Sequence, residues 1–117
     1  CSASGLIQKK PEMLVRTKSI DDLATKQKLM LEKAPELLKD GGHLVYCVCS
    51  IIYSEGEEQI RTFLKNFKNF SLINCFSSIK SYGTVNNNLP YFFITPDLID
   101  ENGGIDGFFI ACLKKNY

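Results

Sequence analysis

Two short apolar runs constrain the fold of this chain more than any other feature of its sequence. His43–Val48 reads His-Leu-Val-Tyr-Cys-Val, and Gly107–Leu113 reads Gly-Phe-Phe-Ile-Ala-Cys-Leu. Runs of this length that are bounded by turn residues and rich in β-formers predict strands buried on both faces, the kind found inside parallel sheets. The apolar and polar residues of Phe70–Cys75 alternate and predict a third strand.

A helix is predicted ahead of the first strand. Five residues recur at helical spacing: Leu23, Gln27, Met30, Ala34 and Leu37. Ser19 can cap this helix, with Asp22 in the capping-box position three residues later. Pro35 should kink or restart the helix near its end, and the segment Asp40-Gly41-Gly42 should stop it.

A second helix is predicted between the first two strands. Ser54-Glu55-Gly56-Glu57 repeats the capping-box signature, and the inward face of the helix is predicted at Ile60, Phe63, Leu64 and Phe67. Residues 76–104 hold little pattern, with a loop tip at Asn86-Asn87-Asn88. The order of helix, strand, helix, strand, long loop and strand predicts the second half of an α/β sandwich.

The bulk properties exclude some classes of function. A net charge of +1 makes no electrostatic case for nucleic acid or membrane binding, and no run approaches the roughly 20 apolar residues that span a bilayer. Five cysteines without regular spacing argue against a disulfide framework and favour a reducing cytoplasm. The chain has a single histidine, and Cys47-Val48-Cys49 has no second pair to complete a zinc site, so we expect no metal.

Two cysteines are candidates for chemistry. Cys49 follows the C-terminal end of a predicted buried strand, where open α/β sheets place their reacting groups. From position alone, a reactive role and a packing role for Cys49 are about equally supported. Cys1 opens a loop of small residues, Cys1-Ser2-Ala3-Ser4-Gly5, which a planar ligand can approach closely. The remaining cysteines are interpreted as small apolar residues of the core: Cys47, Cys75 and Cys112.

These segments resemble motifs of the Sun (Fmu-type) family of ribosomal RNA cytosine-5 methyltransferases. Cys1-Ser2-Ala3-Ser4-Gly5 is similar to the end of Asp-Ala-Pro-Cys-Ser-x-Thr-Gly, and Leu44–Ser50 to Leu-Val-Tyr-x-Thr-Cys-Ser. Glu55-Gly56-Glu57-Glu58 is similar to the family's Glu-Glu-Asn-Glu helix start, and Asp106–Ala111 to its closing Asp-Gly-Phe-Phe-Ile-Ala strand. The chain departs from these motifs at Ser4, Val48 and Gly56, among other positions.

The resemblance implies an α/β fold that is the C-terminal half of a Rossmann-like S-adenosylmethionine-dependent methyltransferase sheet with flanking helices. It implies methyl transfer to C5 of cytosine in ribosomal RNA, with Cys49 adding to C6 and Cys1 assisting release of the product. From position 1 onward there is no glycine-rich donor loop and no acidic ribose ligand. We therefore expect residues 1–117 to be the C-terminal part of a catalytic domain whose S-adenosylmethionine site lies upstream of residue 1.

Other residues are candidates for substrate binding: Ser2 and Gly5 in the first loop, Ser50 beside Cys49, and the basic residues Lys9 and Arg16. A solvated basic turn is at least as well supported for Lys9 and Arg16. Gln27 is expected to hydrogen-bond the backbone of a neighbouring loop, and Phe108 and Phe109 to belong to the core. Asp106 is expected either to orient the active-site loop or to satisfy backbone amides.

Three functions stay open at this point. The chain is an RNA methyltransferase fragment with S-adenosylmethionine as its cofactor, a non-catalytic remnant of a split gene, or a half-domain. A half-domain would bind ribosomal RNA or a separately encoded N-terminal half. Each of these predicts a cytoplasmic protein without a membrane partner.

Overall fold

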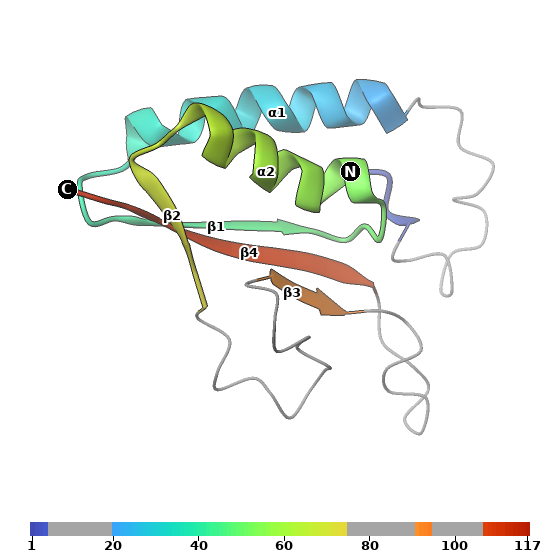
Figure 1. Cartoon of the computed structure of the whole chain (residues 1–117). Coiled ribbons are helices and arrows are strands. Elements are labelled where there is room, and N and C mark those ends of the chain that lie inside the picture. Colours follow the sequence, from blue (N-terminus) through green and yellow to red (C-terminus); the bar gives the residue numbers. More distant parts are fainter. Residues whose placement is uncertain (5–19, 75–90, 95–106) are drawn as a thin grey trace.

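The computed structural model describes residues 1–4, 20–74, 91–94 and 107–117. Its elements are α1 (Ile20–Leu37), β1 (His43–Val48), the short 3-10 helix η3 (Tyr53–Glu55), α2 (Glu57–Asn66), β2 (Phe70–Ile73), β3 (Tyr91–Ile94) and β4 (Phe108–Lys115). The two α-helices lie on the same side of the strands (Figure 1). The core fills the space between them, with Leu31 of α1 and Ile60 and Phe63 of α2 packed over buried side chains of the sheet.

The sheet is built around β4. Strand β1 pairs with β4 from His43↔Lys114 to Val48↔Phe109. β2 pairs with the C-terminal half of β4 and β3 with its N-terminal half, so these two strands share the edge opposite β1. All three pairings are antiparallel. The predicted α/β class is confirmed, but the expectation that the apolar strands pair in parallel is wrong for the pairings described.

Burial on both faces is confirmed for β4 and wrong for β1. In β4, Phe109 and Leu113 point to one face and Cys112 to the other, and none of them is more than 5% exposed. In β1, residues at alternate positions are exposed: His43, Val45 and Cys47. The two strands differ because β4 has strand neighbours along both edges, whereas β1 has one neighbour among the described residues.

Helix α1 lies where the periodicity predicted it, but it turns a different face to the core. Leu31 is buried, whereas Met30 is 74% and Leu37 is 86% exposed. Pro35 lies in the last turn, and the helix ends two residues later. A turn over residues 39–42 follows, in which the amide of Gly42 donates to the carbonyl of Lys39. Gly41 has φ +79°, the left-handed conformation that glycine adopts without strain.

Helix α2 begins differently from the prediction. The expected capping box at Ser54 is wrong, because the N-cap is Gly56 and no side chain caps the helix. The predicted inward face is confirmed, with Ile60 and Phe63 buried and Leu64 and Phe67 packed against them. At Gly56 a Cβ atom would lie 2.8 Å from Cγ of Phe109. The glycine at this position thus lets the start of α2 approach β4 closely.

One strand was missed in the sequence. Residues 76–104 were predicted to hold little regular structure, yet Tyr91–Ile94 forms β3. The run Tyr-Phe-Phe-Ile directly after Pro90 is the composition typical of a short strand. The third predicted strand, Phe70–Cys75, is confirmed over Phe70–Ile73.

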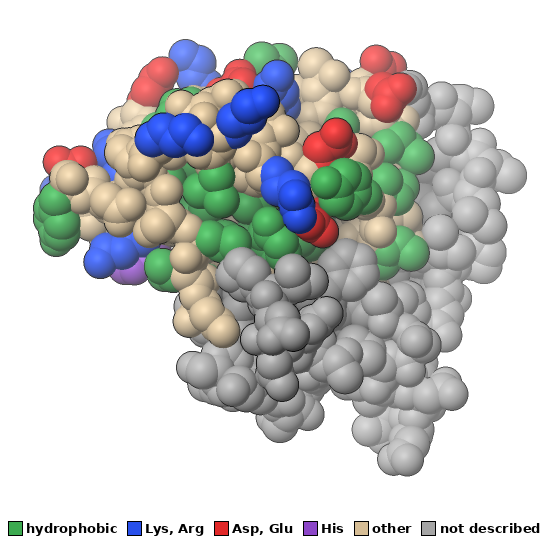
Figure 2. Space-filling view, in the orientation of Figure 1, with side chains coloured by type: hydrophobic (Ala, Val, Ile, Leu, Met, Phe, Trp, Pro, Cys, Tyr) green, Lys and Arg blue, Asp and Glu red, His purple; other side chains and the backbone are tan. Residues whose placement is uncertain are grey.

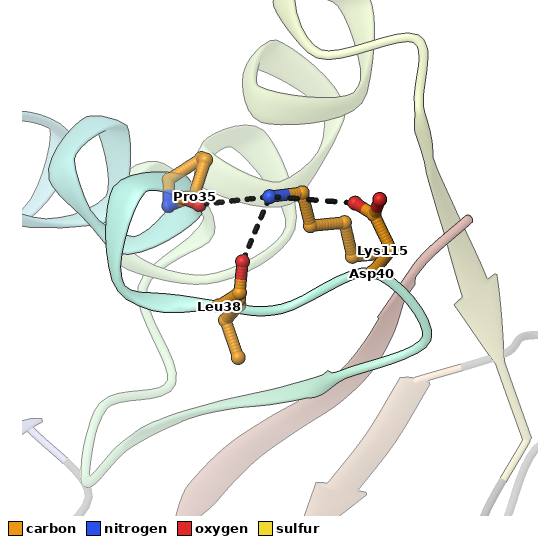
Figure 3. A network of polar contacts seen from close by, with 4 residues as sticks. All are labelled: Pro35, Leu38, Asp40 and Lys115. Carbon is orange, nitrogen blue, oxygen red and sulfur yellow. Dashed lines mark hydrogen bonds and ion pairs between the residues drawn. The ribbon is translucent and has the colours of Figure 1, made fainter. Parts of the chain in front are cut away.

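Lys115 joins the end of α1 to the end of β4 (Figure 3). Its ammonium group donates to the carbonyls of Pro35 at 3.2 Å and Leu38 at 2.8 Å. The carboxylate of Asp40 lies 3.8 Å from the same nitrogen. The last carbonyls of a helix have no partner within the helix, and a cation there also meets the negative end of the helix dipole. Lys115 therefore supplies the C-terminal cap that α1 lacks in its own sequence.

We predict that Lys115→Met lowers the free energy of unfolding by about 1–2 kcal/mol, because methionine keeps the aliphatic stem but removes the ammonium group that donates to both carbonyls. Urea denaturation at pH 7 measures the change. Lys114→Met is the matched control, since this neighbouring lysine points to the opposite face of the strand. Equal losses in the two variants would contradict the capping role of Lys115.

Candidate functional site

Two thiols meet at the end of β1. Cys49 is the first residue after the strand, and Cys1 belongs to the loop of residues 1–4. Their sulfur atoms lie 3.2 Å apart although the residues are 48 positions apart in the chain. Cys1 is exposed and Cys49 is partly exposed, so solvent reaches this pair. The two cysteines singled out in the sequence thus lie side by side at the surface.

A buried carboxylate is hydrogen-bonded to the residues that follow the two thiols in the chain. Glu55, in η3, is fully buried, and its two oxygens accept four hydrogen bonds from three segments of the chain. Oε1 accepts from the backbone amide of Ser2 at 2.6 Å and from Nε2 of Gln27 at 3.1 Å. Oε2 accepts from the hydroxyls of Ser2, at 2.6 Å, and Ser50.

The hydrogen bonds decide the charge of Glu55. Burial alone would raise the pKa of this carboxyl, because the charged form loses its hydration. The donors from Ser2, Ser50 and Gln27 outweigh that effect and hold the pKa below its ordinary value. Glu55 is therefore a buried carboxylate anion at neutral pH.

The loops that carry the two thiols also touch each other directly. The hydroxyl of Ser4 lies 3.1 Å from that of Ser50 and accepts a hydrogen bond from the amide of Ile51. Between Ser2 and Ser4, Ala3 has φ +57°, the left-handed region that costs a non-glycine residue about 1 kcal/mol or more. Such a conformation persists only where surrounding contacts hold it.

Tyr46 attaches the backbone of Glu55 to β1. Its hydroxyl donates to the main-chain carbonyl of Glu55 at 2.6 Å, and its ring meets that of Phe109 edge to face. Burial raises the pKa of Tyr46 well above its ordinary range, and the nearby charge of Glu55 adds to the rise. The phenol is thus a fixed hydrogen-bond donor.

A groove of about 420 Å³ opens beside the thiols, between α1 and β1. Both thiols and Gln27 line it, and its remaining walls come from residues of α1 and β1: Met30, Leu31, Ala34, Leu44, Val45, Tyr46, Cys47 and Val48. The amide oxygen of Gln27 is buried and has no partner among the described residues. The groove is therefore mostly apolar, with its polar groups near Cys1 and Cys49.

The other cysteines differ from this pair. Cys47 is exposed, so its interpretation as a core residue is wrong. It lines the groove, and the partial burial of its thiol raises its pKa. A raised pKa reduces the thiolate fraction and hence nucleophilicity at neutral pH. Cys112 is buried in β4, as predicted, but it is disulfide-bonded, so the expectation of a free thiol there is wrong. Cys75 lies outside the described residues.

The candidate substrate-binding residues divide into two groups. Ser2 and Ser50 lie beside the thiols, and their side chains both donate to Glu55. Gly5, Lys9 and Arg16 lie outside the described residues, as does Asp106. Contacts of Ser2, Gly5, Ser50, Lys9 and Arg16 with a substrate stay a prediction.

Sequence reasoning missed the centre of this network. Gln27 donates to the carboxylate of Glu55 and not to a loop backbone, so that expectation is wrong. Glu55 was interpreted only as part of a helix start. Nothing in the local sequence marks it as buried, because two of its partners, at positions 2 and 27, come from distant segments.

Three further properties bear on function. Over the part of the chain that the structure describes, no three or more His, Cys, Asp and Glu residues gather into a possible metal site. Neither described helix is long and apolar enough to cross a bilayer. On the face shown in Figure 2, basic and acidic side chains of the described residues are interspersed, and some pair directly, as Arg61 does with Glu57 at 2.8 Å.

Comparison of sequences relates the chain to known methyltransferases. Residues 1–114 match the family described as 16S rRNA methyltransferase RsmB/F. The ribosomal RNA small subunit methyltransferase B of Photorhabdus laumondii is 38% identical over 98% of this chain, and that of Pectobacterium atrosepticum is 34% identical over 99%. The chain spans about a quarter of the length of these relatives, 24% in both cases.

Solved structures share the fold. PH0851 superposes with a TM-score of 0.80 and 32% identity, covering 98% of this chain and 25% of that one. A methyltransferase homologue from Pyrococcus horikoshii gives a TM-score of 0.63 and 31% identity over 84% of this chain and 33% of its own. NSun6 from Pyrococcus horikoshii gives 0.74 over the whole chain and 28% of its own, but at 24% identity it supports the fold alone.

The lowered pKa of Glu55 predicts a pH dependence of stability. Because the folded-state pKa lies below the unfolded one, the carboxylate stabilises the fold fully above the unfolded value of about 4.3. That stability is lost as the pH falls through the folded-state pKa. We expect Glu55→Gln to lower the free energy of unfolding at pH 7 by about 2–3 kcal/mol, since buried donors lose their acceptor.

The difference in the free energy of unfolding between the original chain and Glu55→Gln should narrow as the pH falls from 5 to 3. Urea denaturation across this range measures it, and Glu58→Gln, which changes an exposed carboxylate three residues away, is the control. A difference that stays constant with pH would contradict a charged Glu55.

Proposed function

Because this chain belongs to the 16S rRNA methyltransferase family RsmB/F, we propose that it carries the two reactive cysteines of an RNA cytosine-5 methyltransferase. The contact between Cys1 and Cys49 at the end of β1 is the observation that carries the proposal. Residues 1–117 are, in this proposal, the C-terminal part of the catalytic domain. The substrate is ribosomal RNA, as the names of the relatives suggest.

Cys49 is the proposed nucleophile. Cytosine C5 is too weak a nucleophile to take up a methyl group unaided. Addition of the Cys49 thiolate forms a sulfur–carbon bond at C6, and the electrons of the C5–C6 double bond become available at C5. Cys47, with its raised pKa, is less suited to this step.

Cys1 is the proposed release residue. Once C5 carries the new methyl group, the proton on C5 must leave. In the proposal the Cys1 thiolate accepts this proton, the electrons of the C–H bond re-form the C5–C6 double bond, and the Cys49 thiolate departs. C5 and C6 are neighbouring atoms, so the two groups that act on them must lie close together. A sulfur–sulfur distance of 3.2 Å meets that requirement.

The family's cofactor, S-adenosylmethionine, supplies an electrophilic methyl group when it is bound. The described residues do not fit its site: the groove beside the thiols is walled mainly by apolar side chains and offers no carboxylate for a ribose. We therefore propose that a segment outside the described residues binds this cofactor.

Two other functions remain as outcomes of the tests. A half-domain would bind ribosomal RNA or a separately encoded N-terminal half without chemistry, and a remnant would do neither. In the proposed function the RNA backbone meets the basic residues Lys9 and Arg16, with Ser2, Gly5 and Ser50 near the base. The protein would act in the cytoplasm, where ribosomal RNA is processed.

We predict that Cys49→Ala lowers the rate of methylation at least a thousandfold. The test uses the chain fused to the donor-binding segment of a relative's catalytic domain. Without addition at C6, C5 stays unreactive. Transfer of a radiolabelled methyl group to ribosomal RNA measures the activity, and Cys47→Ala is the matched control, expected to stay within a few-fold of the parent. Full activity of Cys49→Ala would rule out Cys49 as the nucleophile.

Cys1→Ala should fail at a later step. Addition and methyl transfer can proceed while release of Cys49 stalls, so a covalent protein–RNA complex should accumulate in the fusion protein. Denaturing electrophoresis detects this complex as a slowly migrating band that nuclease removes. The double variant Cys1→Ala/Cys49→Ala should form none, and a band that persists in it would show that the link involves another residue.

A further inference from the structure

We infer that Glu55 is a positioning residue whose buried carboxylate fixes the position of Cys1 relative to Cys49. The inference rests on the proposed function, since it assigns to Glu55 the placement of the two thiols on which that function depends. Glu55 has no direct contact with either sulfur atom among the contacts described. It acts through Ser2 and Ser50, the residues next to Cys1 and Cys49 in the chain.

One carboxylate oxygen connects the two thiol-bearing loops. Oε2 accepts from the hydroxyl of Ser2, one residue after Cys1, and from that of Ser50, one residue after Cys49. The backbone amide of Ser2 donates to the other oxygen, which also fixes the main chain next to Cys1. Any movement of one loop relative to the other must therefore stretch or break bonds to the same anion.

The number of donors requires a charged carboxylate at this position. An ionised carboxylate offers four acceptor sites, and Glu55 fills all four with Ser2, Gln27 and Ser50. The amide of a glutamine would keep one oxygen and turn an NH₂ group toward two of these donors. Because the site is buried, the displaced donors would have no water in place of the lost acceptor.

The backbone of Glu55 is fixed independently of its side chain. The hydroxyl of Tyr46 holds its carbonyl against β1, and η3 joins it directly to the start of α2. The first loop, in contrast, depends on contacts outside itself, because Ala3 has a strained left-handed conformation. The anion thus connects a rigid part of the fold to a loop that does not hold its own conformation.

The rate at which Cys1 and Cys49 form a disulfide in the full chain reports how closely the two thiols are held together. This measurement does not require methyltransferase activity. Diamide removes two electrons and two protons from the two thiols, which join as a disulfide, while diamide is reduced to the corresponding hydrazine. Peptide mass spectrometry identifies the Cys1–Cys49 link and measures its rate of formation. We expect Glu55→Gln to slow this rate at least tenfold and Glu55→Asp, which keeps the charge, to recover part of it.

Two controls separate positioning from stability. Glu58→Gln changes a nearby exposed carboxylate and should leave the rate unchanged. Lys115→Met destabilises the fold at the far end of β4 and should leave it unchanged as well. If Glu55→Gln does not fold, Gln27→Met and Ser2→Ala provide the test, because each removes one side-chain hydrogen bond to the Glu55 carboxylate. Each should slow formation of the Cys1–Cys49 disulfide a few-fold.

Disulfide formation in Glu55→Gln at the rate of the parent chain would overturn the inference, as would equal slowing in Lys115→Met. Either result leaves the proposed function standing. Conversely, full methylation by Cys49→Ala in the fusion protein would remove the proposed function without changing how Glu55 affects disulfide formation. The two failures are thus distinguishable.

Discussion

The backbone hydrogen bonds of β4 are the constraint on which the rest of this structure depends. Among the described residues, β1, β2 and β3 each pair with β4 and with no other strand. Phe109, Ala111 and Leu113 form the floor of the core on which both helices pack. The end of β1, where Cys49 lies, is fixed by its register with Phe109. A slip of one residue would turn the side chains of β1 to the opposite face and separate the thiols.

Much of the fold could be predicted because it depends on local patterns. The runs around Leu44 and Phe109 marked two strands, and the spacing of Ile60 and Phe63 marked the inward face of α2. The predictions that were wrong concern properties that depend on neighbours in space. The burial of β1 on one face follows from its place in the sheet, and the core-facing side of α1 follows from where the helix meets η3 and α2. Neither property can be predicted from the local sequence.

The site shows the same division. Cys1 and Cys49 could be proposed because their segments resemble motifs of known methyltransferases, a resemblance that the family match supports. Glu55 could not be proposed, because glutamate before a helix is ordinarily a solvated residue that favours the helix dipole. Only the convergence of Ser2, Gln27 and Ser50 on one buried carboxylate reveals its place. Hydrogen-bond networks between distant segments carry little periodic signal.

The cap that Lys115 places on α1 has a consequence for the order of folding. The carbonyls of Pro35 and Leu38 obtain their donor from a residue about 80 positions later in the chain. During synthesis on the ribosome, α1 and β1 therefore emerge well before the strand that completes them. Closing such long loops is slow, because the entropy of the chain is lost before the contacts form. We expect the helix to fray at its C-terminal turn in the nascent chain and the sheet to form in one late, cooperative step.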